Sequence, residues 1–156
     1  MDDRPRWVVI GIGNPERCDD GAGQLVARRL RKRLPPYAVI VETSGEPSAL
    51  LNELAKAPSA IVIDACLSGT CPGSVQRFDV TAKPLPETFR DLSSHGLGVG
   101  VAIELARSLG QLPRCCILYA IEGRHFGFGR QISPEVDVAI GEVCGRIAAD
   151  ILTGRF

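Results

Sequence analysis

Apolar residues along this chain fall into short continuous runs, and segments with helical spacing lie between them. Four of the runs have the length of buried strands and are bounded by glycine, proline or polar residues. Strands are therefore predicted at 7–12, 37–42, 60–65 and 115–121. A fifth segment, 74–80, alternates weakly after a Pro-Gly pair, which is typical of an antiparallel edge strand.

Between these runs, apolar residues recur every three or four positions, which is the spacing of an amphipathic helix. Helices are predicted at 21–34, 48–57 and 96–109 and from 133 to about 152. Pro35 and Pro58 stop the first two, because proline cannot continue a helix. Ser48 and Ser133 are the predicted N-cap residues of the second and the last.

The alternation of strands and helices predicts an α/β protein. We expect a three-layer α/β/α sandwich whose sheet has about five strands, mostly parallel, with one strand antiparallel. No repeat, low-complexity tract or linker interrupts the pattern, so residues 1–156 are predicted to form a single domain. The order of the strands in the sheet does not follow from the sequence.

Composition excludes several classes of function. Hydrophobic residues make up 45% of the chain, and 18 basic residues balance 18 acidic ones, which favours neither nucleic acid nor an acidic membrane surface. No apolar run is long enough to cross a bilayer, and the first one is too short for a signal peptide, so a cytoplasmic protein is expected. The six cysteines are irregularly spaced, as reduced thiols are. Cys18 and Cys66, each close to an acidic residue, are either packing residues or reactive thiols.

Acidic and imidazole side chains follow several of the predicted strands. They are the Asp19-Asp20 pair, Asp64 and His95. Because the carboxyl ends of parallel strands meet at one edge of a sheet, these side chains are expected to converge there. Carboxylates and one imidazole can form a three-ligand metal site with open positions. Taken singly, each also has a plain structural explanation as a helix cap or a turn residue.

Two other functions share parts of this pattern. Gly11 and Gly13 after the first strand are typical of a dinucleotide-binding turn, but Glu16 stands where the third glycine is needed. The acidic residues also fit a phosphoacceptor receiver domain, but the stretch 120–125 after the last strand lacks the required lysine. Both functions are therefore disfavoured.

The order of the motifs is that of a known family. Gly11-x-Gly-Asn14, four residues, and then Asp19-Asp20-Gly21-x-Gly23 closely resemble the opening motif of the nickel–iron hydrogenase maturation endopeptidases. Asp64 and Ser94-His95-Gly96 stand at the family's second and third signature positions, and Ser133-Pro-Glu-Val136 is similar to its tail. The resemblance covers nearly the whole chain.

The resemblance implies that Asp20, Asp64 and His95 bind metal and carry catalysis, although many members have glutamate where Asp20 stands. It implies a hydrolase, an aspartic or metal-dependent endopeptidase, that removes the C-terminal extension of a nickel-loaded hydrogenase large-subunit precursor. The nickel is expected to arrive with the precursor, and the site to accept other divalent metals. The alternative is a chaperone-like module that binds the nickel-loaded precursor without cleaving it.

Three further features receive predicted roles. Asp19 is expected to orient a metal ligand and is a reserve ligand itself. Glu122 is a weaker candidate for substrate contact or proton transfer. The glycine-rich stretch around His125 is either a plain surface loop or a precursor-binding loop with Phe126 and Phe128 as aromatic anchors.

Overall fold

The computed structural model describes residues 6–90 and 98–155. Its five-stranded sheet has the order β2-β1-β3-β5-β4. The strands are β1 (Trp7–Ile12), β2 (Ala38–Thr43), β3 (Ser59–Cys66), β4 (Val75–Asp79) and β5 (Cys115–Glu122). Neighbouring strands are parallel except for β4, which pairs antiparallel with β5 at one edge. The predicted antiparallel edge strand is thus confirmed.

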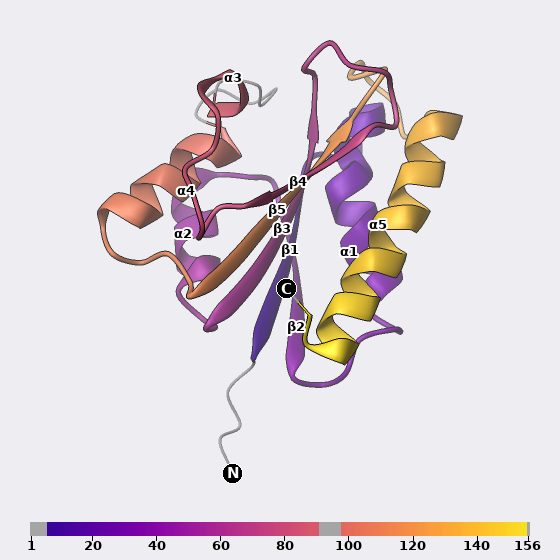
Figure 1. The fold of residues 1–156 in the computed structure, drawn as a ribbon. Coiled ribbons are helices and arrows are strands. Elements are labelled where there is room, and N and C mark those ends of the chain that lie inside the picture. Colours follow the sequence, from indigo (N-terminus) through magenta and orange to yellow (C-terminus); the bar gives the residue numbers. More distant parts are fainter. Residues whose placement is uncertain (1–5, 91–97, 156) are drawn as a thin grey trace.

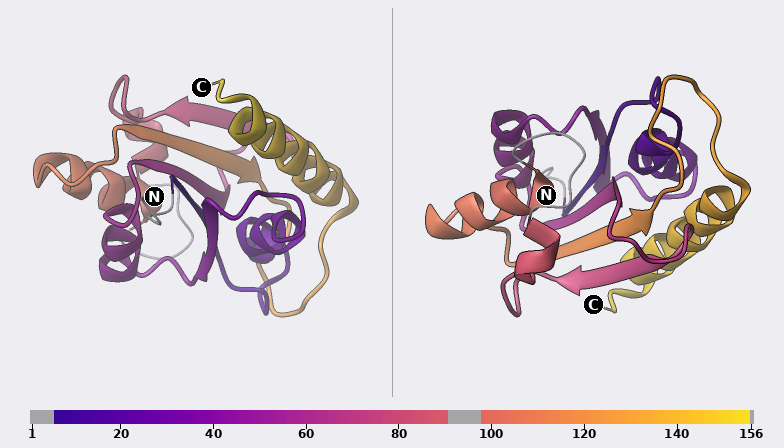
Figure 2. Two further views of the ribbon diagram at one scale, coloured as in Figure 1. Left: turned by 90° about the horizontal axis from the view of Figure 1, so that it is seen from below. Right: turned by 90° about the horizontal axis from the view of Figure 1, so that it is seen from above.

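Helices cover both faces of the sheet. They are α1 (Ala22–Leu30), α2 (Pro47–Leu54), α3 (Glu87–Arg90), α4 (Val99–Ser108) and α5 (Pro134–Thr153), and a 3₁₀ turn, η1 (Cys18–Gly21), precedes α1. Helices α1 and α5 lie on one face and α2 and α4 on the other (Figures 1 and 2). The predicted three-layer α/β/α sandwich is confirmed. Among the described residues no helix has the length and apolar character needed to cross a membrane.

The three inner strands are buried because their side chains are apolar on both faces. Each face has its own apolar core. Val9, Ile63 and Ile121 belong to the core under α1 and α5, whereas Ile10 and Val62 belong to the core under α2 and α4. Helices on both faces are what such continuous apolar strands require.

Local structure differs from the predictions at three helix termini. Helix α1 ends at Leu30 rather than at residue 34, and turns follow in which Arg33 N donates to Leu30 O at 2.9 Å. Helix α2 begins at Pro47, one residue early, and the hydroxyl of Ser48 donates to the Glu46 side chain instead of capping. Ser133 occupies the N-cap position of α5, but its hydroxyl does not cap the helix either. The short elements η1 and α3 were not predicted.

Candidate functional site

The turn η1 lies directly against the carboxyl ends of β1 and β3 because glycines leave the space open. A Cβ on Gly13, which has a φ of 143°, would lie 1.8 Å from Asp20 O. A Cβ on Gly23 would lie 2.3 Å from Ile63 O and 2.4 Å from Ile12 O. The start of α1 therefore contacts both strands backbone to backbone, and this contact places η1 beside the end of β3.

Asp20 and Asp64, two of the three predicted metal ligands, come close together at this edge. Their exposed fractions are 1% and 8%. One oxygen of Asp20, Oδ2, accepts a hydrogen bond from Asn14 N at 2.9 Å. Burial, and then the negative charge of Asp20, raise the pKa of Asp64 to about 8, against a smaller lowering effect of the hydrogen bond from Ala65 N. The pair is thus a buried site of concentrated negative charge.

This donor set fits a divalent cation. Carboxylate oxygens are suitable ligands for hard and borderline metals, and a cation would offset the repulsion between the Asp20 and Asp64 side chains. Within residues 6–90 and 98–155, no group of three or more His, Cys, Asp and Glu side chains is arranged to hold a metal ion. The third predicted ligand, His95, lies outside the described residues.

Asp19 has a different role from the one predicted. Its side chain is fully buried, and its carboxylate accepts hydrogen bonds from Arg124 N (2.8 Å), His125 N (3.0 Å), Ser133 N (2.8 Å) and Ser133 Oγ (2.8 Å). Burial acts to raise the pKa of Asp19, but these hydrogen bonds outweigh it and lower the pKa. Both oxygens are thus engaged by the segment that follows β5, so Asp19 is poorly suited to serve as a reserve ligand.

Glu122 likewise serves structure where substrate contact was predicted. It is 2% exposed, and its carboxylate accepts hydrogen bonds from Ser68 N, Ser68 Oγ (2.7 Å) and Gly69 N (3.0 Å) and from the Cys66 thiol (3.2 Å). Burial opposes these bonds, which nevertheless lower the pKa of Glu122. Burial, followed by Glu122, raises the pKa of the Cys66 thiol. Glu122 therefore fixes the start of the β3–β4 loop, and Cys66 is a protonated packing residue.

Comparison with known proteins identifies the family. The model of the hydrogenase maturation proteases (HycI) matches residues 25–150, well over half of the chain. The chain belongs to the hydrogenase maturation protease family. The matched range contains Asp64 and the position of His95 and begins after Asp20.

Two curated relatives are similar to this hydrogenase maturation protease family member. The hydrogenase expression/formation protein HupD of Thiocapsa roseopersicina is 24% identical over 135 residues, which cover 85% of this chain and 61% of HupD. The hydrogenase expression/formation protein HoxM of Cupriavidus necator is 26% identical over 113 residues, which cover 71% of this chain and 56% of HoxM. The chain thus spans about three fifths of the length of these relatives.

Solved structures share the fold. The nickel–iron hydrogenase maturation protease HycI of Thermococcus kodakarensis superimposes with a TM-score of 0.75 at 25% identity, covering 96% of this chain and 94% of that one. The hydrogenase maturating endopeptidase HybD of E. coli gives a TM-score of 0.79 at 21% identity with the same coverage. The mixed five-stranded α/β fold is therefore that of the hydrogenase maturation proteases.

One residue that positions the site was missed from the sequence. Gln24 on α1 is 9% exposed, and its Nε2 donates to Gly13 O at 2.7 Å and to Thr43 O at 3.0 Å. It thereby joins the ends of β1 and β2 beside η1. The available signal was an amide side chain next to the apolar stripe of the predicted helix at 21–34.

In this maturation protease, replacing Gly23 with alanine is expected to destabilise the fold. The added methyl group would meet the carbonyl oxygens of Ile63 and Ile12 at 2.3 and 2.4 Å, so α1 would have to move away from the sheet. We expect a loss of about 1–3 kcal/mol in the free energy of unfolding. Gly141→Ala on α5 is the matched control, because nothing lies within 4 Å of its Cβ and alanine favours a helix. Urea unfolding measures both, and equal stabilities would contradict the packing argument.

Proposed function

We propose that this chain removes the C-terminal extension of a nickel-loaded nickel–iron hydrogenase large-subunit precursor. The observation that carries the proposal is the buried pair Asp20 and Asp64 at the carboxyl edge of the sheet. Membership of the hydrogenase maturation protease family supports the reaction class. Because the curated relatives HupD and HoxM extend beyond the matched part, we also propose that residues 1–156 act as one domain.

In this proposal Asp20, Asp64 and His95 contact the nickel of the precursor. A divalent metal held by carboxylates and imidazole supplies Lewis acidity toward a peptide carbonyl and a source of activated water. The carboxylates give the loaded precursor contacts that an empty precursor lacks, so selectivity is a difference of affinities. Asp19 and Glu122 hold the two loops beside the pair and take no part in bond cleavage. We place the reaction in the cytoplasm, without nucleic acid or membrane as partner.

Incubation with purified precursor tests the proposal directly. We expect the nickel-loaded precursor to lose its extension, and the nickel-free precursor to stay intact over the same time, as measured by intact-protein mass spectrometry. An extract with known processing activity serves as the positive control for the precursor. A stable complex with uncleaved, nickel-loaded precursor would instead favour the non-cleaving chaperone-like module.

A further inference from the structure

Phe128 is exposed to an unusual degree for an aromatic residue. Its exposed fraction is 97%, and the next most exposed large apolar side chain of the described residues is Val138 at 71%. It stands in the glycine-rich loop between β5 and α5. Exposing a whole aromatic ring to water is unfavourable, so this position invites a partner.

The loop cannot fold back to bury Phe128, because its backbone is bonded to the residues before α1. Cys18 N donates to Gly129 O at 2.7 Å, and Gly129 N donates to Glu16 O at 2.8 Å. Arg17 Nε donates to Phe126 O at 3.1 Å. The carboxylate of Asp19 holds the loop at both ends, as described above. Phe128 is therefore presented on a braced backbone.

The two phenylalanines of the loop have opposite environments. Phe126 is partly buried and packs against the apolar core under α1 and α5, and its ring would lie 2.5 Å from a Cβ on Gly123. Phe128 follows two residues later and points to solvent. The loop thus uses one ring to attach itself to the fold and leaves the other free.

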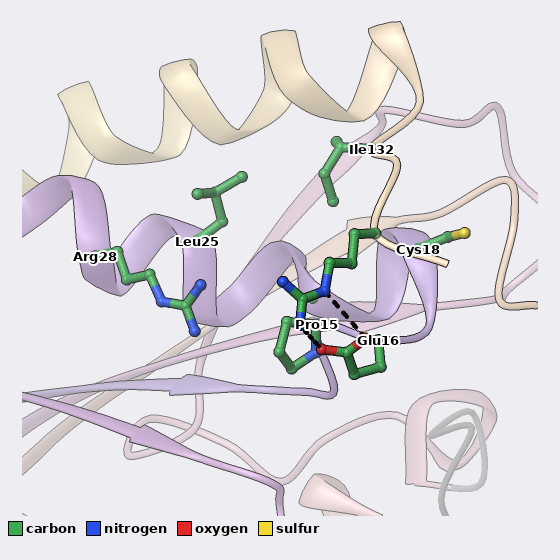
Figure 3. Close-up of a pocket in the computed structure, with 8 residues that line it drawn as sticks. Pro15, Glu16, Cys18, Leu25, Arg28 and Ile132 are labelled. Atoms are coloured by element: carbon green, nitrogen blue, oxygen red, sulfur yellow. Dashed lines mark hydrogen bonds and ion pairs between the residues drawn. The ribbon is translucent and has the colours of Figure 1, made fainter. Parts of the chain in front are cut away.

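Two hollows adjoin Phe128. A hollow of about 580 Å³ is lined by Phe128, His125 and Gln131 among others, and it shares Cys18 and Ile132 with a second hollow of about 350 Å³. Figure 3 shows the second hollow, with Pro15, Leu25 and Ile132 around it. We call Phe128 and these two hollows the Phe128 surface.

The charges of the Phe128 surface are compensated within the chain. Arg130 pairs with Glu16, Arg124 with Glu135 at 2.5 Å, and Arg28 with Glu42 at 2.5 Å. A surface whose cations and anions already neutralise each other selects a partner by apolar fit more than by charge. The complementary patch is therefore apolar and uncharged.

The Phe128 surface is separate from the environment of Asp64. A small cavity at Asp64 is lined by Phe89, Val99 and Gly100, from α3 and α4 and their side of the sheet. The Phe128 surface instead adjoins α1 and the start of α5. Both nevertheless adjoin η1, which carries Asp19 and Asp20.

We propose that the Phe128 surface is a docking site for the folded body of the large-subunit precursor, with the Phe128 ring inserted into an apolar cleft of that partner. This inference rests on the proposed function. Docking here, away from Asp64, would leave the extension free to reach the carboxylate pair. A second copy of the chain is a poorer occupant, because one aromatic ring buries about 150–250 Å² and stable dimers bury about 1,200 Å² or more.

Steady-state processing of full-length nickel-loaded precursor tests the docking site. For Phe128→Ala we expect KM to rise at least about tenfold, with kcat within about twofold of wild type, as for an interface hot spot. Phe128→Tyr keeps the ring and is expected to retain most of the affinity. Leu152→Ala, a 61% exposed apolar residue at the far end of α5, is the matched control with unchanged kinetics. Thermal melting of each variant confirms that the fold is intact.

The outcomes separate this inference from the proposed function. Processing by wild type together with an unchanged KM for Phe128→Ala would overturn the docking site alone. If wild type does not cleave a precursor that the positive-control extract does process, the proposed function fails. Calorimetric titration of the precursor then decides, and equal affinity for wild type and Phe128→Ala overturns the docking site. A wild-type dimer that Phe128→Ala converts to monomer in sedimentation would overturn it in favour of self-association.

Discussion

Replacing Asp64 with asparagine is expected to abolish processing of the nickel-loaded precursor. Asparagine has nearly the same shape, but it carries no negative charge and is a poorer metal ligand. We expect the rate to fall by about 10²–10⁴-fold, the range for loss of a group that acts at the reacting centre. His95→Ala is expected to show a comparable loss, because both side chains belong to the same proposed ligand set. Mass spectrometry of the precursor over time measures the rates.

The same Asp64→Asn variant is expected to keep its stability. The carboxyl group is 8% exposed and lies in the field of Asp20, so the fold gains little from its charge. Asp137→Asn on α5, whose side chain is 55% exposed, is the matched control, with wild-type activity and stability. Wild-type processing by Asp64→Asn would remove Asp64 from the proposed site, and an unfolded variant would assign Asp64 to the fold.

Replacing Asp19 with alanine is expected to cause the largest loss of stability. Three backbone N–H groups, of Arg124, His125 and Ser133, would lose their acceptor together with the Ser133 hydroxyl. An unsatisfied buried donor costs about 1–3 kcal/mol, so we expect a loss of about 3–5 kcal/mol in the free energy of unfolding after some relaxation. That is a large share of the stability of an ordinary domain. Urea unfolding followed by circular dichroism measures it.

Two comparisons make the Asp19 prediction specific. Asp19→Asn keeps one carbonyl oxygen and is expected to lose less stability than Asp19→Ala. Asp137→Ala removes an exposed ion pair with Arg29 and is expected to change the free energy of unfolding by less than about 1 kcal/mol. Similar stabilities for Asp19→Ala and Asp137→Ala would show that water replaces the carboxylate without cost.

Strands were predictable where burial dominates the sequence. The predicted strands at 7–12, 60–65 and 115–121 match β1, β3 and β5 within a residue at each end, because continuous apolar runs have few other ways to be buried. Helix ends were less predictable. Leu34 continues the apolar spacing of α1, but the chain leaves the helix at Leu30 ahead of Pro35, whose ring disfavours helical backbone in the residue before it.

The candidate site was predictable only in part. That Asp20 and Asp64 meet follows from the parallel order of the strands. The roles of Asp19 and Glu122 depend on partners far along the chain, such as Ser133, which is 114 residues from Asp19, and Ser68, which is 54 residues from Glu122. No local pattern signals such contacts. His95 stays a prediction, because it lies outside the described residues.

The turn η1 turns two chemically identical neighbours into unlike parts. A tight turn of about three residues rotates successive side chains by roughly a third of a circle. One aspartate is thereby committed to the loop after β5, and the next one faces the neighbour at the end of β3. Deleting or inserting a single residue in this turn would exchange their directions without altering the composition, so the length of the turn is as much a determinant of specificity here as the identity of its residues.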